Sequence, residues 1–348
     1  RSSGTKRCLE SASLLVAGLM YSEPNKKVQS DFEYLTSMWR PIPIHSTSPA
    51  GADPMLDTIA PCPNADKAFE EMEDTNDRLV QIYTENADFL SEISRYTGEK
   101  IDSLKKAYEL YQELYIETQF DYHWWKEPYR VWTEDYEMYA ISKLRELSRL
   151  YWSVQWSNKL LQTLRVGLLI KELNHHIRQH MEGRGEKQVL VYSTHDTQIA
   201  LLLHAFGLYN GFLIPPGATL TLELHHDHRV PTRGDDSDQY FMRLYYFNET
   251  YTNAWAYQAV SKTICLRVDA DGMHWRCPAK HFVESTVTME PYDWQYQCGL
   301  RLRLYSFFAV NIYILGTNLV CLLTLLVVLR IYSSRIRCSY NTAQFFNR

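Results

Sequence analysis

Twenty-six consecutive residues near the carboxyl end, Leu304 to Leu329, carry no charged side chain. A helix needs about 20 apolar residues to cross a bilayer core of about 30 Å. Asn311, Asn318 and Gly316 are tolerable within such a helix. A buried core helix is the alternative, but the chain would then have to return to a folded domain, and only 19 residues follow Leu329. We therefore predict a transmembrane helix over 304–329.

Arginines flank this segment unevenly. Two of them precede it and four follow it: Arg301 and Arg303, then Arg330, Arg335, Arg337 and Arg348. Because short cytosolic segments carry the excess of Lys and Arg, we place the tail 330–348 in the cytosol. Residues 1 to about 300 are then lumenal or extracellular.

The cysteines agree with this topology. Five of the seven lie on the predicted lumenal side, where disulfides persist: Cys8, Cys62, Cys265, Cys277 and Cys298. An odd number leaves one over, and Cys8, on the first expected helix, is the candidate for a buried free thiol. Cys321 lies in the span, and Cys338 is either a palmitoylation site or a plain thiol. A sequon at Asn248 predicts a glycan on the lumenal side.

The length, composition and net charge of the chain limit the classes of protein to which it can belong. A chain of 348 residues can form one large or two modest domains, and 45% hydrophobic residues argue against disorder. The net charge of -5 is not the positive charge that is typical of proteins that bind nucleic acid. The first residue is Arg1 and no signal peptide is visible, so we expect that the natural amino terminus is absent from this sequence.

Hydrophobic periodicity predicts an α/β unit interrupted by a helical block. A helix is expected over 6–20, and amphipathic helices run from Asn64 to about residue 183, with a break at Thr97-Gly98 and an N-cap at Asp102 or Ser103. Strands are expected over the β-type runs that follow: 189–193, 218–226 and 240–248. The Pro-punctuated stretch 40–46 is also β-like.

His195 and Asp196 stand where the strand 189–193 ends and a helix begins. Open α/β sheets place their sites at the carboxyl ends of strands, and a helix amino terminus favours an anion. Asp196 alternatively only caps the helix, and for the pair taken alone this is the favoured interpretation.

Other histidines suggest a metal only weakly. His176 and His180 are spaced by one helical turn, and His225, His226 and His228 cluster with Asp227. Neither group has a third ligand at a recognisable spacing, so we predict solvated surface for both. No metal or cofactor is expected.

The stretch "YSTHDTQIALLLHAFGLYNG" (192–211) is similar to the carboxyl-terminal His-Asp motif of the histidine acid phosphatases of lysosomal and prostatic type. Further segments resemble the same family in the right order up to about residue 300: "RSSGTKRCLESASLLVAGL" (1–19), "WRPIPIHS" (39–46), "WTEDYEMYAISKLRELS" (132–148), "LYYFNET" (244–250) and "EPYDWQYQC" (290–298).

The resemblance implies a phosphoglycerate-mutase-like α/β sandwich, incomplete at the amino terminus, with a helical cap domain. The α/β catalytic domain would comprise 1–60 and 161–300, and the cap 61–160, followed by the transmembrane helix 304–329 and the cytosolic tail 330–348. It also implies hydrolysis of phosphate monoesters through a phosphohistidine, without a metal. By motif, His195 would bind the phosphate, Asp196 would protonate the leaving alcohol, Arg1 would bind phosphate and Trp132 would border the substrate pocket.

Two departures from the family pattern stand out. The nucleophile-bearing Arg-His-Gly motif does not occur in these 348 residues, so we expect this chain alone to be inactive. The resemblance also pairs Cys62 with Cys298 and Cys265 with Cys277, whereas another family disulfide has neither partner here, with Thr219 at one of its positions.

The alternative function is a non-catalytic, membrane-anchored ectodomain of the same fold that binds a phosphorylated ligand or a protein partner. An enzyme tuned to one sugar phosphate or phospholipid is a further possibility. Neither Tyr332 nor Tyr340 has a bulky apolar residue three positions later, as a lysosomal sorting signal needs. We therefore expect a single-pass membrane protein of lysosome or plasma membrane, and the family often forms homodimers.

Overall fold

The computed structural model describes residues 1–19, 42–46, 49–121, 123, 133–186, 189–228, 239–247, 258–259, 267–268 and 275–345. Two compact units make up the chain, Arg1–Trp294 and Gln295–Arg348.

Three extended segments lie side by side at the start of the first unit. Ser2 N donates to His45 O at 2.9 Å, and Ser3 N donates to Ser193 O at 2.9 Å. Ser2 and Ser193 form a parallel bridge, and the α-amino group of Arg1 donates to Val191 O at 2.8 Å. Of the segment 189–193, which was predicted to be a strand, only Ser193 takes part in a bridge, so this prediction is wrong in extent.

The helix α1 (Lys6–Leu19) follows at once and confirms the helix expected over 6–20. It buries Cys8 and Ala12 on one face. Cys8 is a free, buried thiol, as the sequence predicts. The same face of α1 therefore lies against the end of the segment 191–195, because Cys8 Sγ donates to Thr194 O at 3.3 Å.

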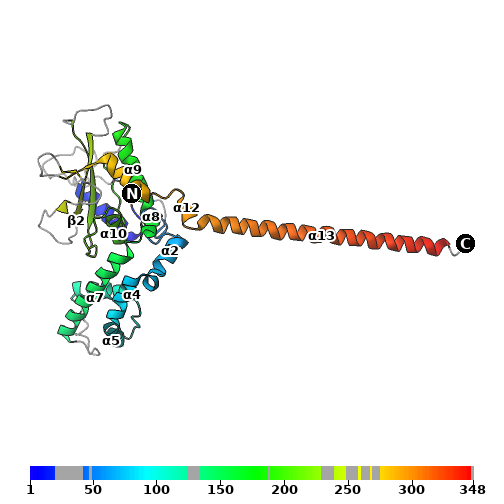
Figure 1. Ribbon diagram of the computed structural model, residues 1–348, viewed down its shortest axis with the longest axis horizontal. Helices are drawn as coiled ribbons and strands as arrows, with labels where there is room; N and C mark the ends of the chain where they lie inside the picture. Colours follow the sequence, from blue (N-terminus) through cyan, green and yellow to red (C-terminus); the bar gives the residue numbers. More distant parts are fainter. Residues whose placement is uncertain are drawn as a thin grey trace, which may run out of the picture. The chain divides into compact units, whose positions relative to one another are not determined.

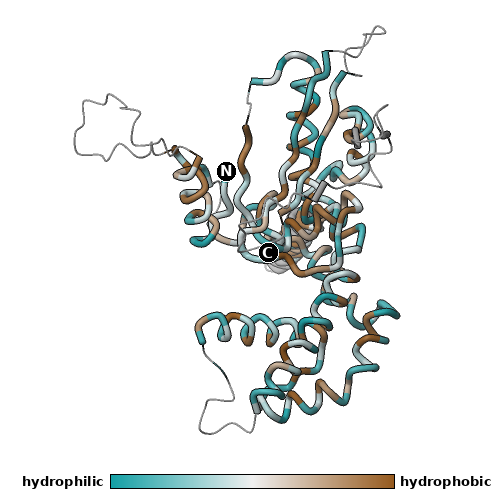
Figure 2. The backbone as a smooth tube through the Cα atoms, turned by 90° about the vertical axis from the view of Figure 1, so that its left-hand side faces the viewer, coloured by the Kyte–Doolittle hydropathy of each residue, from teal (hydrophilic) through white to brown (hydrophobic). Residues whose placement is uncertain are grey.

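The expected helical block is present, and its helices pack through apolar stripes. They are α2 (Pro63–Glu70), α3 (Met72–Thr75), α4 (Asp77–Glu85), α5 (Ala87–Thr97), α6 (Leu104–Gln119) and α7 (Glu134–Gln155). Figure 1 shows α4, α5 and α7 gathered in one group away from β2 and α9, and Figure 2 shows hydrophobic and hydrophilic residues mixed along this group.

The ends of these helices follow local chemistry. Of the two candidate N-caps of α6, Ser103 is the one used, and its hydroxyl accepts from Lys106 N at 3.1 Å. The helix α5 ends at Thr97 because Gly98 takes the left-handed conformation, at φ 76°. The predicted break at Thr97-Gly98 is thus confirmed.

Three further helices complete the first half of the fold: α8 (Lys159–Arg165), α9 (Gly167–Met181) and α10 (Asp196–Ala205). Gly167 opens α9 at a close approach, since a Cβ there would lie 2.4 Å from the carbonyl oxygen of Met289. The helix α10 is buried along most of its length, with Leu201 and Leu203 fully covered. It therefore forms part of the core and fixes the position of its own first residues.

Five strands form an antiparallel sheet within the described residues, in the order β1-β2-β5-β4, with β3 also pairing with β2. They are β1 (Thr219–His226), β2 (Tyr240–Phe247), β3 (Gln258–Ala259), β4 (Arg267–Val268) and β5 (Trp275–Pro278). The strands predicted over 218–226 and 240–248 are confirmed, and they pair in the register Leu222 to Leu244.

The sheet is joined to the helices through α11 (Ala279–Thr286), which is followed by the 3-10 turn η3 (Val287–Met289) and by α12 (Trp294–Gln297). The ring of Phe282 on α11 lies 5.4 Å from the ring of Phe206, the residue that ends α10. The described part of this unit is thus mixed α/β and mostly helical.

The second unit consists mainly of α13 (Leu300–Phe345). Its stretch Ile312–Ser333 has a mean hydropathy of 2.5 and is long and apolar enough to cross a membrane. The leucines along it are exposed. A helix over the predicted segment 304–329 is therefore confirmed.

Cys62, Cys277 and Cys298 are each disulfide-bonded. Cys265, the predicted partner of Cys277, lies outside the described residues, as do Trp132 and Asn248. The pairing of these cysteines therefore stays a prediction.

Candidate active site

The site is built around a tight turn, 53–58, that precedes α2. Leu56 N and Asp57 N both donate to Asp53 O, at 3.2 and 2.8 Å. Asp53 Oδ1 accepts from Met55 N at 2.9 Å, and Asp57 Oδ2 accepts from Asp53 N at 3.0 Å. Both carboxyl groups are almost fully buried, at 1% and 0% exposure. The turn therefore presents two fixed carboxylates to the interior.

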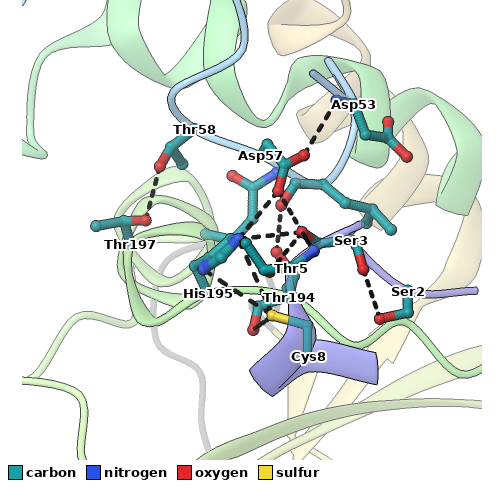
Figure 3. A network of polar contacts seen from close by, with 12 residues as sticks. Ser2, Ser3, Thr5, Cys8, Asp53, Asp57, Thr58, Thr194, His195 and Thr197 are labelled. Carbon is teal, nitrogen blue, oxygen red and sulfur yellow. Dashed lines mark hydrogen bonds and ion pairs between the residues drawn. The ribbon is translucent and has the colours of Figure 1, made fainter. Parts of the chain in front are cut away.

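Three side-chain contacts join this turn to the start of α10, and Figure 3 shows the one between Thr58 and Thr197. Gln198 Nε2 donates to Met55 O at 2.6 Å, and Thr194 Oγ1 donates to Leu56 O. The hydroxyl groups of Thr58 and Thr197 lie 2.8 Å apart. The first turn of α10 is thus held against residues that precede it by more than 130 positions.

His195 is the N-cap residue of α10, and its own side chain makes no capping bond. Instead, Nε2 lies 3.0 Å from Asp57 Oδ1, and 3.2 Å from the hydroxyl of Ser3, which itself donates to Asp57 Oδ1. The other ring nitrogen, Nδ1, accepts from Arg7 Nη2 at 3.0 Å. The side chain is 10% exposed, so the ring lies at the edge of the interior with both nitrogens engaged.

Cys8 lies beside the same ring. Its Sγ is 4.0 Å from both Nδ1 and Nε2 of His195. Thr5 adds a hydroxyl 3.4 Å from Nε2. Figure 3 shows Ser3, Thr5 and Cys8 converging on His195 from the beginning of the chain and from α1.

Asp196 is the first residue of α10, where the helix dipole favours a negative charge. Its Oδ1 accepts from Thr197 N at 2.8 Å, so the capping interpretation is correct in part. Burial nevertheless raises the pKa of the Asp196 carboxyl, against the opposing effects of the Thr197 amide, His195 and Arg7. A carboxyl group with a raised pKa holds its proton more readily and can serve as an acid.

An electrostatic effect links the helical block to this carboxyl through Tyr108 on α6. Burial is the main cause that raises the pKa of the Tyr108 phenol, and the charge of Asp196 raises it further. Tyr108 therefore lies near enough to Asp196 for the charge of one group to affect the pKa of the other. Trp132, the aromatic residue predicted to border the pocket, lies outside the described residues.

Arg1 faces a different opening. Its Nη2 donates to Asp53 Oδ2 at 2.8 Å, and its side chain is 30% exposed. An open cavity of about 470 Å³ adjoins it, lined by Arg1, Asp53, Pro54, Met55, Leu168, Lys171, Glu172 and His175. The structure therefore brings His195 and Asp196 together directly, and links Arg1 to them through the carboxylates of Asp53 and Asp57.

Asp53, Asp57 and Arg7 are the residues of this site that the sequence interpretation did not include. Arg7 stands four positions after Ser3, in a segment already assigned to the site, so it could have been considered. Asp53 and Asp57 carry no local signal, because their roles depend on contacts with residues 52 and 138 positions away. The described residues contain no group of three or more His, Cys, Asp or Glu that could hold a metal ion.

The model of the histidine phosphatase superfamily (branch 2) matches residues 1–247. The chain belongs to this superfamily. Its mixed α/β architecture is therefore the histidine phosphatase fold.

Curated relatives within the superfamily are acid phosphatases. The chain is 26% identical to the lysosomal acid phosphatase of Bos taurus over 304 residues, which cover 86% of this chain and 64% of that protein. It is 25% identical to the lysosomal acid phosphatase of Homo sapiens, with the same coverage, and 26% identical to the prostatic acid phosphatase of Bos taurus, over 76% of this chain and 62% of that protein. The chain thus spans less than two thirds of the length of these relatives, and the resemblance identified from the sequence is confirmed.

Proposed function

We propose that this chain carries the phosphate-binding and proton-donating part of an acid phosphatase site. The observation that supports this most directly is the adjacency of His195 and Asp196 at the start of α10, with Asp196 buried enough to raise the pKa of its carboxyl. Phosphoryl transfer needs cations and hydrogen-bond donors around the phosphoryl oxygens and an acid for the leaving oxygen. Arg1, Arg7 and His195 can supply the cations and hydrogen-bond donors for the phosphoryl oxygens. Asp196 can supply the acid for the leaving oxygen.

The proposed reaction has two steps. A nucleophilic histidine attacks the phosphorus of the monoester, the ester P–O bond breaks, and Asp196 gives its proton to the departing alkoxide. Water then attacks the phosphohistidine, the P–N bond breaks, and the Asp196 carboxylate takes the proton of that water. The nucleophile would stand in an Arg-His-Gly motif, which these 348 residues do not contain, so it would have to come from outside them.

The same proposal covers the wider architecture. We propose that 61–160 form a helical cap over the catalytic domain, which is supported by the effect of the Asp196 charge on the pKa of Tyr108 in α6. The span 304–329 would anchor the protein in the lysosomal or plasma membrane, with the first unit lumenal and 330–348 cytosolic. The comparisons do not favour the non-catalytic alternative, because the relatives named above are acid phosphatases.

Hydrolysis of p-nitrophenyl phosphate at acidic pH tests the function. We expect no turnover by the 348-residue chain, and turnover by a longer product of the same transcript that includes an Arg-His-Gly segment. In the longer protein, Asp196→Asn should lower kcat by about a hundredfold or more, because it removes the acid. The exposed Asp102→Asn should leave kcat unchanged. Rapid turnover by the short chain, abolished by Asp196→Asn, would show that the nucleophile lies within it.

A further inference from the structure

The end of strand β1 carries two histidines that are not part of the candidate active site. We infer that His226 and His228 form a binding site for a Zn²⁺ ion, and that Gln239 is the residue that orients the His226 ring for it. This part of the sheet has no role in the proposed function, so each proposal can be correct without the other.

The pairing of β1 with β2 places these residues. His226 is the last residue of β1 and pairs with Tyr240, the first residue of β2. The pairing continues for one more residue, because Asp227 N donates to Gln239 O at 2.9 Å. Side chains two positions apart in an extended chain lie on the same side of it. Accordingly, His226 and His228 are both exposed, whereas Asp227 between them is buried.

The distance between the two rings fits a zinc ion. Nδ1 of His226 lies 3.3 Å from Nε2 of His228, and the ring planes stand at 88° to each other. A tetrahedral Zn²⁺ ion that is bound by two imidazoles at about 2.0–2.1 Å holds their nitrogens about 3.3–3.4 Å apart. A square-planar ion at the same bond lengths would need about 2.8–3.0 Å. The two nitrogens are therefore spaced like one edge of a tetrahedral zinc site.

The amide of Gln239 determines which nitrogen of His226 is free for a metal. Nε2 of His226 lies 2.8 Å from Gln239 Oε1, and because an amide oxygen only accepts, the neutral ring carries its proton on Nε2. Nδ1 then holds a lone pair, to which His228 Nε2 donates. Histidines that bind metals almost always donate their other N–H to a carboxylate, a carbonyl or water. Gln239 thus provides the outer contact that a zinc-binding histidine needs.

The two rings differ in how firmly they are held. The ring of His226 also packs on the ring of Tyr240, with centroids 4.6 Å apart, so it is fixed from two sides. His228 lies beyond the end of the strand and is exposed, so its ring can turn. To bind the ion, His228 only has to carry its proton on Nδ1 instead of Nε2, which gives Nε2 a lone pair. No proton leaves the two neutral rings, and Zn²⁺ replaces the hydrogen between them.

Two protein nitrogens make this an open site. Structural zinc sites usually have four protein ligands and catalytic ones three, so water has to fill the remaining positions here. For the same reason the sequence predicts no metal at this cluster, since neither the spacing of the two nitrogens nor the contact with Gln239 can be predicted from it. The adjacent His225 is engaged elsewhere, because its Nε2 lies 2.8 Å from Glu223 Oε2. We therefore expect a single exchangeable ion at His226 and His228.

Calorimetric titration of the 348-residue chain in detergent micelles with zinc chloride tests the site, at about pH 7.5, where imidazoles are neutral. His228→Asn should weaken zinc binding by about tenfold or more, because one of two protein ligands is lost. Gln239→Met should weaken it by about tenfold, since the acceptor for His226 Nε2 is lost while the length of the side chain is kept. His225→Asn is the matched control, because it removes the neighbouring histidine of the same strand, and it should leave the affinity unchanged.

A second measurement locates the ion without any substitution. Diethyl pyrocarbonate modifies histidine nitrogens that have a free lone pair, and peptide mapping gives the rate for each residue. Zinc should slow the modification of His226 and His228, since it occupies their lone pairs. The rate at His225 should be the same with and without the ion.

The results decide each part of the inference. Equal zinc affinities of His228→Asn and His225→Asn overturn the site, and so does an unsubstituted chain that binds no Zn²⁺. Equal affinities of Gln239→Met and the unsubstituted chain overturn the role of Gln239. Unchanged modification rates at His226 and His228 in the presence of zinc also overturn the site, even if a variant does not fold. The proposed phosphatase function is decided separately, by the hydrolysis assay of the longer protein.

Discussion

Gln198 donates from Nε2 to the carbonyl oxygen of Met55 at 2.6 Å, across 143 positions of sequence. The Gln198 side chain is fully buried in the first turn of α10. Met55 stands in the middle of the turn that carries Asp53 and Asp57. This bond is therefore one of the contacts that join the turn with the two carboxylates to the helix that carries His195 and Asp196.

We expect Gln198→Leu to lower the free energy of unfolding by about 1–3 kcal/mol, because it leaves a buried carbonyl oxygen without its donor. The substitution should also weaken phosphate binding, since the turn and the helix are no longer held in register. Chemical denaturation followed by tryptophan fluorescence measures the first effect, and phosphate titration measures the second.

The exposed Gln81 on α4 provides the control for this substitution. Among the described residues, its amide bonds to Glu85 and Arg78 on the same helix. Gln81→Leu should change the free energy of unfolding by less than about 0.5 kcal/mol. If both leucine variants are equally stable, the bond between Gln198 and Met55 does not hold the site together.

The parts of the fold that could be predicted from the sequence depend on neighbours along the chain. Ser103 could be named as an N-cap and Gly98 as a helix end because each acts within its own turn. The strand β1 alternates polar and apolar residues from Thr219 to Leu224, β2 is rich in aromatic residues, and both lie where these patterns place them. The extent of the segment 189–193 could not be predicted, because it depends on how much partner strand lies beside it.

The candidate site likewise contains residues that could be identified from the sequence and residues that only the folded structure reveals. His195 and Asp196 could be identified because a strand end and a helix start are readable in one short stretch, and a family motif coincides with them. Asp57 could not be, since an aspartate in a loop has many ordinary roles and its contact with His195 arises only in the folded chain. The position of Arg1 beside Asp53, facing a cavity that His195 does not line, is likewise a tertiary result.

Arg7 also affects the acid of the proposed reaction. Burial raises the pKa of Asp196, whereas the positive charge of Arg7 is among the effects that lower it. Removing this cation must raise the pKa further, so the protonated acid persists to higher pH. In the longer protein, Arg7→Gln should therefore move the alkaline limb of the kcat profile to higher pH.

Lys6→Gln serves as the control for that shift, because Lys6 is the neighbouring cation of α1 and is not among the groups that lower the pKa of Asp196. The alkaline limb should stay in place in this variant. A limb that moves to lower pH in Arg7→Gln contradicts the assignment of Asp196 as the acid.

His204 makes the stability of the fold depend on pH. Burial, together with the nearby charge of Lys159, lowers the pKa of His204 from 6.5 to about 4. The unfolded chain takes up a proton on His204 near pH 6.5, whereas the folded chain does not. The contribution of the neutral His204 to the free energy of unfolding is therefore complete above pH 6.5 and is lost as the pH falls toward about 4. Between pH 7 and pH 5 the loss amounts to about 2 kcal/mol.

We expect His204→Phe to flatten this dependence, since phenylalanine can still stack on Tyr209 and does not titrate. Denaturant titrations at pH 7 and pH 5 give the two free energies of unfolding for each protein. His175→Gln, a change at an exposed histidine of α9, should keep the dependence of the unsubstituted chain. An unchanged slope in His204→Phe would mean that another group is responsible.

The disulfide framework is open to a direct chemical test. Peptide mapping without reduction should yield Cys62 joined to Cys298 and Cys265 joined to Cys277, as the family resemblance implies. Loss of the first bond in the double variant Cys62→Ser/Cys298→Ser should cost about 2–5 kcal/mol of stability, because it closes a long loop of the chain. Substitution of the free thiol Cys8 by Ser should leave the map unchanged. Any other partner of Cys62 refutes the proposed alignment in that region.

The membrane span is tested by placing charge at its centre. Leu322 and Leu326 lie one turn apart in the apolar stretch of α13, and both side chains are exposed. Arginine at the centre of a membrane helix costs about 2.5–3.5 kcal/mol for insertion, so Leu322→Arg/Leu326→Arg should release the chain from the membrane. Extraction with alkaline carbonate should leave the unsubstituted chain and Leu322→Ile/Leu326→Ile in the pellet and move the arginine variant to the supernatant. Recovery of the unsubstituted chain in the supernatant would show that α13 does not span a bilayer.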